Sequence, residues 1–377
     1  MKPEVSILKC NNYDGELIYE TLKKSVDILG GMSSFIKKGE TVLLKPNLLF
    51  AKGPEKAVTT HPSVLYATLK LVKEAGGRPL VGDSPGIGNA VKVASKAGIK
   101  EVCDKLNVSI IDFKESVEVD NPGGRTFKNF TIAKEVRDVD CIINLPKLKT
   151  HAHMFLTLGV KNLFGCIAGR RKFQWHFAAG RDRDTFARML VDLYHLLKPR
   201  LTIVDGILAM EGNGPGSGDP KELGLIFASS DCIALDRVIT EVLGANAYDL
   251  LTTKVANEDD MGVTSLKEIE IKGEKLSNIT VRGFKFPFLT KVDDMLPLPA
   301  FFTHYFRESF TPKPSIHNKK CIMCKICIDV CPADIMSLKR GDIDIDYESC
   351  IRCYCCQEVC PKGAISVKQG WLGRLLT

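Results

Sequence analysis

Eight cysteines in the C-terminal part of the chain constrain it most, because they form two runs of identical spacing. The first run, Cys321, Cys324, Cys327 and Cys331, reads C-x-x-C-x-x-C-x-x-x-C and is followed by Pro332. The second run repeats this spacing and the following proline, with Cys350, Cys353, Cys356 and Cys360. Thiolates two residues apart can bind several irons from one tight loop, and a proline redirects the chain because it fixes φ. The pattern predicts two [4Fe–4S] clusters.

The two runs resemble the signature of bacterial two-cluster ferredoxins, which are small α+β domains. This resemblance implies a crossed ligand set, in which the fourth cysteine of each run binds the cluster of the other run. It assigns to one cluster Cys321, Cys324, Cys327 and Cys360. It assigns to the second cluster Cys350, Cys353, Cys356 and Cys331. Cys355 interrupts the second run off its register, so we do not expect it to be a ligand.

Zinc and disulfides are the alternative uses of these cysteines. Zinc usually takes paired C-x-x-C sites closed by four ligands, which two complete runs with matching prolines do not favour. Disulfide frameworks suit short secreted domains, whereas this chain has 377 residues and its start, MKPEVSILKC, has no apolar signal core. No apolar run approaches the roughly 18 residues of a membrane span. We therefore expect a reducing, cytoplasmic location.

The charge of the chain gives little support to a nucleic-acid partner. The formal net charge is +7, and two clusters of about −2 each would lower it to about +3. Such a small excess does not favour nucleic acid, and no basic run with interleaved aromatic residues is present. A redox partner protein is the partner that we expect.

The chain divides by composition into four parts. Residues 1–285 alternate apolar strands and amphipathic helices, which predicts an α/β domain with a largely parallel sheet flanked by helices. Residues 286–318 form a connector rich in proline and aromatic residues, which either packs between the domains or contacts a membrane or partner. Residues 319–370 form the ferredoxin-type domain, and 371–377 a short tail. The expected strands are Val5–Leu8, Thr41–Leu44, Pro79–Gly82, Val108–Phe113, Cys141–Leu145, Leu201–Val204 and Leu225–Ala228.

Polar residues follow the ends of several expected strands, where open α/β sheets bind ligands. These residues are Lys45, Asn47, Asp83, Lys147, Lys149, His151 and Asp205. Lys147 to His151 are expected on an irregular segment. Together with Lys161, Lys172 and His176 they are expected to form a cationic cluster that could hold a carboxylate or phosphate. The histidines could act as acid or base. The alternative is a solvated basic loop with structural histidines.

Two acidic residues complete the candidate site. Asp83 is either a ligand-facing carboxylate or the cap of the following helix. Glu211 precedes a glycine-rich stretch, Gly212 to Gly218, whose backbone N–H groups could approach a phosphate. The stretch does not match a nucleotide-hydrolysing P-loop. The sequence therefore leaves open whether this domain binds an additional ligand or a metal.

Several motifs in residues 1–285 together resemble the DUF362 family. They are Leu44–Asn47, Gly82–Gly86, Asn144–His151, Lys161–Gly165, Val204–Gly206 and Glu211–Gly216. Members often carry a C-terminal two-cluster ferredoxin module, so the resemblance implies an α/β fold with a redox association. A remote likeness of the family to the cofactor domain of lactate racemase is a fold analogy.

Three functions fit these features. The first is a redox enzyme, an iron–sulfur oxidoreductase whose clusters pass electrons to a substrate or cofactor in the α/β domain. The second is an electron-transfer adaptor that docks its ferredoxin module onto a partner enzyme, and the third is a metal or cofactor maturation factor. We favour the first because the α/β domain exceeds what a carrier needs, although no residue set matches a defined catalytic mechanism.

Overall fold

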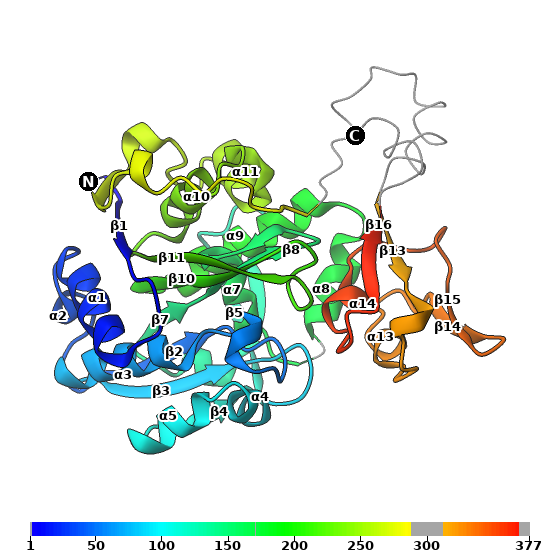
Figure 1. The fold of residues 1–377 in the computed structure, drawn as a ribbon, viewed down its shortest axis with the longest axis horizontal. Helices are drawn as coiled ribbons and strands as arrows, with labels where there is room; N and C mark the ends of the chain where they lie inside the picture. The colour runs from blue at the N-terminus through cyan, green and yellow to red at the C-terminus, as the bar shows by residue number, and fades with distance from the viewer. Residues whose placement is uncertain (1, 170, 288–311, 369–377) are drawn as a thin grey trace.

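The computed structural model describes residues 2–169, 171–287 and 312–368 as an α/β domain followed by a small C-terminal module, residues 312–368 (Figure 1). Most of the expected connector, and the tail 371–377, lie outside the described residues. At the described start of the connector, Phe286 stacks on Phe155 of the α/β domain, with ring centroids 4.9 Å apart. Within the described part of the chain, no helix is long and apolar enough to cross a membrane.

One sheet of ten strands organises the α/β domain. Its main path runs β12-β1-β11-β10-β7-β2-β3-β4, and β8 and β9 branch from β10. Along this path β11 runs antiparallel to both neighbours and the other pairs are parallel, which confirms the predicted largely parallel sheet. The strands are β1 (Glu4–Lys9), β2 (Thr41–Pro46), β3 (Arg78–Asp83), β4 (Ile110–Asp112), β7 (Cys141–Leu145), β8 (Lys147–His151), β9 (Phe155–Thr157), β10 (Leu201–Glu211), β11 (Asp219–Ser229) and β12 (Glu270–Gly273). A separate hairpin pairs β5 (Ser116–Asp120) with β6 (Asn129–Ala133).

Both faces of this sheet are buried, because successive side chains of a strand point to opposite sides. In β2, Val42 and Leu44 belong to one core with residues of α1, α3, α4 and α5, whereas Leu43 belongs to a second core with residues of α9. Each fully buried Leu contributes roughly 1.5–3 kcal/mol, so a central strand is held from both sides. The helices are α1 (Gly15–Asp27), α2 (Met32–Phe35), α3 (Pro62–Glu74), α4 (Ala90–Lys96), α5 (Ile99–Lys105), α6 (Lys134–Arg137), α7 (Gly159–Asn162), α8 (Arg171–Ala179), α9 (Arg183–Leu197), α10 (Cys232–Val242) and α11 (Leu251–Glu258).

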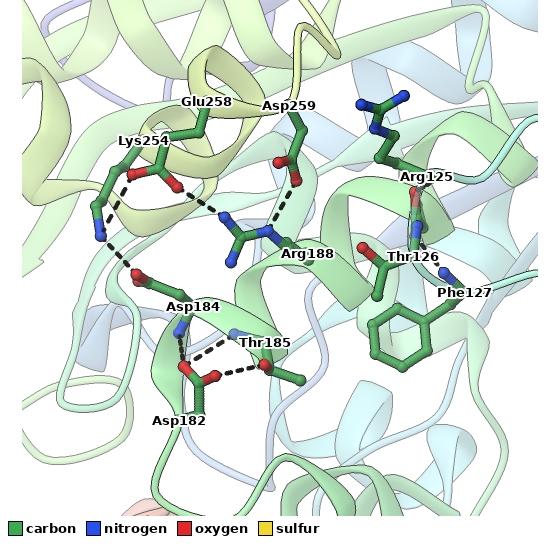
Figure 2. Close-up of polar contacts among 11 residues, drawn as sticks. Arg125, Thr126, Phe127, Asp182, Asp184, Thr185, Arg188, Lys254, Glu258 and Asp259 are labelled. Atoms are coloured by element: carbon green, nitrogen blue, oxygen red, sulfur yellow. Dashed lines mark hydrogen bonds and ion pairs between the residues drawn. The ribbon is translucent and has the colours of Figure 1, made fainter.

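Charged side chains fasten α9 to α11 (Figure 2). Arg188 of α9 donates from Nε to Asp259 at 2.8 Å and from Nη2 to Glu258 at 2.7 Å. Lys254 of α11 forms an ion pair with Asp184 of α9. These pairs are partly exposed, so each contributes about 0–1 kcal/mol. Together they set the position of α9, whose inner face packs beneath the site described below.

The C-terminal module contains two antiparallel strand pairs and two short helices. β13 (Lys313–Ile316) pairs with β16 (Ile365–Lys368), and β14 (Met336–Lys339) pairs with β15 (Asp342–Ile345). The helices are α13 (Ile326–Asp329) and α14 (Cys355–Glu358). α14 and β16 face the α/β domain, and β14 and β15 lie on the far side (Figure 1).

Candidate functional site at the domain junction

Two cavities in the module are each lined by four of the patterned cysteines. One cavity is lined by Cys321, Cys324, Cys327 and Cys360. The other is lined by Cys331, Cys350, Cys353 and Cys356. Each cavity therefore brings together the first three cysteines of one run and the fourth cysteine of the other. Cysteine sulfur is the donor that iron–sulfur clusters take, so the residues present fit two clusters.

The two cysteine loops repeat each other in backbone conformation as well as in sequence. Met323 and Lys325 of the first loop have φ of 55° and 61°, and Arg352 and Tyr354 of the second have 58° and 59°. Left-handed backbone is unfavourable for non-glycine residues, so the surrounding structure must hold it in place. In both loops a short helix, α13 or α14, begins directly after the second left-handed residue. Both runs therefore fold as one repeated cysteine-presenting loop.

The second cysteine run faces the α/β domain and is held there by hydrogen bonds. Gln357 Nε2 lies 2.9 Å from Asn213 Oδ1 and 3.1 Å from the carbonyl oxygen of Gly214, and donates to both. Arg181 Nε donates to the Cys350 carbonyl at 3.1 Å. The glycine-rich stretch after Glu211 thus forms part of the surface on which α14 docks. In this stretch the N–H group of Gly214 is already bonded to Thr150 Oγ1, at 3.2 Å.

An open cavity of about 800 Å³, the junction pocket, lies where α14 meets the carboxyl ends of β2 and β3. The α/β domain contributes segments after these strands, part of β8 and β9, and the face of α8. The module contributes Cys355, Glu358 and Val359. Of the residues predicted for a ligand site, the structure brings together here Asn47, Asp83, Lys149, His151, Lys161, Lys172 and His176.

Lys147 to His151 form strand β8, so the expectation of an irregular segment is wrong. β8 pairs with β10 and β9, and its two-residue period points Leu148 into a hydrophobic core. Lys149 is buried and its Nζ donates to the Val58 carbonyl at 2.7 Å. Burial lowers the pKa of Lys149 to about 7. The alternative of a solvated basic loop is therefore also wrong.

Asp83 lies at the wall of the pocket in an ion pair, with its Oδ1 2.8 Å from Lys45 Nζ. Its Oδ2 accepts the backbone N–H of Leu48 at 2.7 Å. The helix that follows, α4, is capped by Asn89. The suggestion that Asp83 caps this helix is therefore wrong. Lys45 is fully buried beneath the pocket and is not among its lining residues.

His151 connects the α/β domain to the module. Its Nδ1 accepts the backbone N–H groups of His153 and Met154, both at 3.2 Å. The ring proton therefore lies on Nε2, which is 3.0 Å from Glu358 Oε1. Burial lowers the pKa of His151, which favours this neutral imidazole. Burial would raise the pKa of Glu358, but the contact with His151 and the charge of Lys161 outweigh it and lower that pKa.

Lys161, Lys172 and His176 complete the polar wall of the pocket. Lys161 Nζ lies 4.6 Å from the centroid of the Phe164 ring, and Lys172 Nζ donates to the Ser84 carbonyl. Burial lowers the pKa of Lys161, and that of Lys172 to about 8. His176 stacks on Phe186 with centroids 4.2 Å apart, and burial lowers its pKa to about 3.

Lys147, Asp205 and Glu211 do not reach the junction pocket. Asp205 lies inside β10 and accepts hydrogen bonds from Lys147 Nζ at 2.8 Å and from Tyr13 OH at 2.7 Å. Glu211 accepts the backbone N–H of Lys285 at 3.0 Å. These groups are satisfied within the protein and hold neighbouring segments together.

Several pocket residues could not be recognised from the sequence. Thr157 of β9, and Cys355 and Glu358 of α14, line the pocket without having been assigned to a ligand site. The position of Cys355 off the cluster register was a signal, whereas nothing in the sequence indicated that α14 would cover the α/β domain. Among the described residues, no group of three or more His, Cys, Asp or Glu side chains could hold a single metal ion.

Comparisons with known proteins agree with this two-part structure. Residues 42–241 match the family model described as Domain of unknown function (DUF362), and residues 313–361 match that of a 4Fe-4S dicluster domain. A thylakoid-associated protein from Synechocystis sp. is 39% identical over 316 residues, which cover 81% of this chain and 95% of that protein. The chain belongs to the DUF362 family. Its C-terminal module is an iron–sulfur domain with an electron-transfer or redox role.

Two solved structures are more remote. The lactate racemase apoprotein from Thermoanaerobacterium thermosaccharolyticum has 13% identity and a TM-score of 0.39, over 61% of this chain and 54% of that one. A protein from Thermotoga maritima has 16% identity and a TM-score of 0.37, over 60% of this chain and 57% of that one. The chain thus spans little more than half the length of each.

Proposed function

We propose that the protein is an iron–sulfur redox protein whose two [4Fe–4S] clusters exchange electrons with a small molecule in the junction pocket. One observation carries this proposal: Cys355 and Glu358, on the helix within the second cysteine run, line the same pocket as Lys161 and His176. A bound cluster supplies one-electron chemistry at a potential set by its surroundings. If the protein is an enzyme, it is an oxidoreductase.

The cysteines on the two sides of the module differ in exposure, which supports a direction for the electron path. Cys350, Cys353 and Cys356 are buried at the junction, whereas Cys324 of the other cavity is exposed. Exposed lysines flank Cys324 in sequence, among them Lys325. We place contact with a redox partner protein on this outer side, and the exchange with a pocket ligand on the inner side.

Within the pocket, the residues of the α/β domain bind and orient the ligand. Lys161 offers a cationic head, and His176 offers its Nδ1, which has no hydrogen-bond partner among the described residues. Glu358 fixes the ring of His151 through the 3.0 Å contact. The relative is named for thylakoids, and we propose for this chain a reducing compartment such as the cytoplasm.

Anaerobic purification with iron quantification and native mass spectrometry tests the proposal. We expect about eight irons per chain, from two clusters of four, together with an organic ligand that is lost when Lys161→Met is introduced. Cys324→Ala should remove one cluster signal, and retention of both would contradict the ligand assignment. Eight irons without any ligand, with stoichiometric capture of a partner enzyme, would replace this proposal by an adaptor role. Transfer of metal or cluster to an apo-protein would replace it by a maturation role.

A further inference from the structure

The junction pocket contains more lysines than carboxylates. Lys149, Lys161 and Lys172 line it, together with Asp83 and Glu358. Asp83 is neutralised by the 2.8 Å ion pair with Lys45 beneath the pocket. Glu358 is then the remaining carboxylate beside three lysines in the lining, so two positive charges of the described lining side chains are unbalanced when all these groups are ionised and before the charge of a bound cluster is counted.

None of the three lysine heads forms an ion pair among the described residues, although Asp83 acts electrostatically on all three and Glu358 on Lys149 and Lys161. Lys149 donates to the Val58 carbonyl and Lys172 to the Ser84 carbonyl. Lys161 has no ion pair or hydrogen bond there, and lies over the face of Phe164. A buried ammonium without a counter-charge is unfavourable. Lys149 is buried, Lys161 and Lys172 are partly buried, and burial lowers the pKa of all three.

Three uncharged groups in the pocket also lack partners among the described residues, and one of them, Asn47 Oδ1, is an acceptor. Thr157 Oγ1 and His176 Nδ1 have no hydrogen-bond partner within the described residues, although each residue is only 4% exposed. Both residues line the junction pocket. Buried polar atoms are nearly always bonded in folded proteins. A ligand with several acceptor oxygens would supply partners for Thr157 and for the lysines at once.

We infer that the junction pocket binds a small organic dianion, a phosphate monoester or a dicarboxylate, with its anionic group on Lys161 between Lys149 and Lys172. This inference rests on the pocket of the proposed function and names its ligand class. Two negative charges balance the excess of lysines, whereas a monoanion leaves one positive charge uncompensated. The cavity of about 800 Å³, which includes space open to solvent, has more room than a bare phosphate fills. Phe50 and Phe164 offer an apolar surface for the body of the ligand.

Titration calorimetry on the anaerobically purified full-length protein tests this inference. The probes are phenyl phosphate, succinate and, as the monoanion, acetate. The variants are Lys161→Met, which keeps the length of the side chain, Lys161→Arg, which keeps the charge, and Lys96→Ala, an exposed lysine on α4, as the control. Thermal unfolding of each variant shows whether it is folded.

We expect one dianion to bind and acetate to bind at least tenfold more weakly. Lys161→Met should weaken dianion binding about 10- to 100-fold, since a charge-assisted hydrogen bond is lost, whereas Lys161→Arg and Lys96→Ala should retain most of it. Preference for phenyl phosphate would identify a phosphate monoester, and preference for succinate a dicarboxylate. Equal binding of acetate, unchanged affinity in folded Lys161→Met, or binding of none of the probes would overturn the inference. Dianion binding without any response of the clusters would leave the inference standing and reject the proposed electron exchange.

Discussion

Replacing Asp205 by asparagine should destabilise the α/β domain without disturbing the junction pocket. The Asp205 carboxylate accepts from Lys147 Nζ at 2.8 Å, from Tyr13 OH at 2.7 Å and from the His61 backbone N–H at 2.9 Å. The side chains of Lys147 and Asp205 are both 0% exposed. Asparagine keeps the shape of the side chain but removes the charge that balances Lys147.

The size of the effect follows from what Lys147 can do once it is unpaired. It can keep a buried charge, or it can lose its proton, which from an ordinary lysine pKa of about 10.4 costs about 4.6 kcal/mol at pH 7. Removing one partner of a buried ion pair costs about 3–5 kcal/mol in general. This range agrees with the cost of deprotonating Lys147, which sets the upper limit. We therefore expect a loss of about 3–5 kcal/mol at pH 7. At pH 9 the loss should be at most about 2 kcal/mol, because each pH unit lowers the cost of deprotonation by about 1.4 kcal/mol.

Urea unfolding followed by far-ultraviolet circular dichroism, at pH 7 and pH 9, measures this loss. Asp219→Asn, at an exposed position on β11, is the matched control. The double variant Asp205→Asn/Lys147→Met should regain much of the stability, since no charge is left unpaired. An unchanged unfolding free energy in Asp205→Asn, or a loss that grows with pH, would refute this reasoning. Loss of ligand binding at unchanged stability would place Asp205 in the functional site.

Three further predictions concern the module and the pocket. Cys355→Ala should keep the full iron content, whereas Cys353→Ala should lose about half of it, as measured by iron quantification. Gln357→Ala removes the hydrogen bonds to the glycine-rich stretch, so hydrogen exchange there should become faster by about tenfold, a cost of about 1.4 kcal/mol; unchanged exchange would mean that this contact does not hold the module. Affinity for the dianion should fall between pH 6.5 and pH 9, because Lys149 and Lys172 lose their protons through pKa values of about 7 and about 8. Calorimetry at both pH values measures this, and affinity that rises with pH would contradict it.

The alternation of strands and helices could be predicted because each central strand is an apolar run buried on both faces. β7 begins and ends at the predicted residues Cys141 and Leu145. β8 could not be predicted, since its charged residues are untypical of a strand and its pairing depends on β10 and β9, which are formed elsewhere in the chain.

The candidate site was predictable where it depends on local sequence. The cysteine spacing indicates two repeated loops, and Lys149, His151 and Lys161 do gather in one pocket. Sequence position alone did not separate these residues from Lys147, because β8 carries Lys147 to a buried network away from the pocket. Glu358 reaches the pocket only because the C-terminal module docks on the α/β domain. Docking between distant segments leaves no periodic pattern in the sequence, so it could not be predicted.

A redox titration of the two clusters with and without phenyl phosphate or succinate tests most directly whether the pocket and the clusters are coupled. Reduction adds negative charge near the pocket, so a dianion should bind more weakly to the reduced protein. By reciprocity it should lower the midpoint potential of one cluster, by about 59 mV for each tenfold difference in affinity. We predict a shift in one cluster that disappears in Lys161→Met. Unchanged potentials of both clusters while the dianion is bound would contradict electron exchange at the junction pocket.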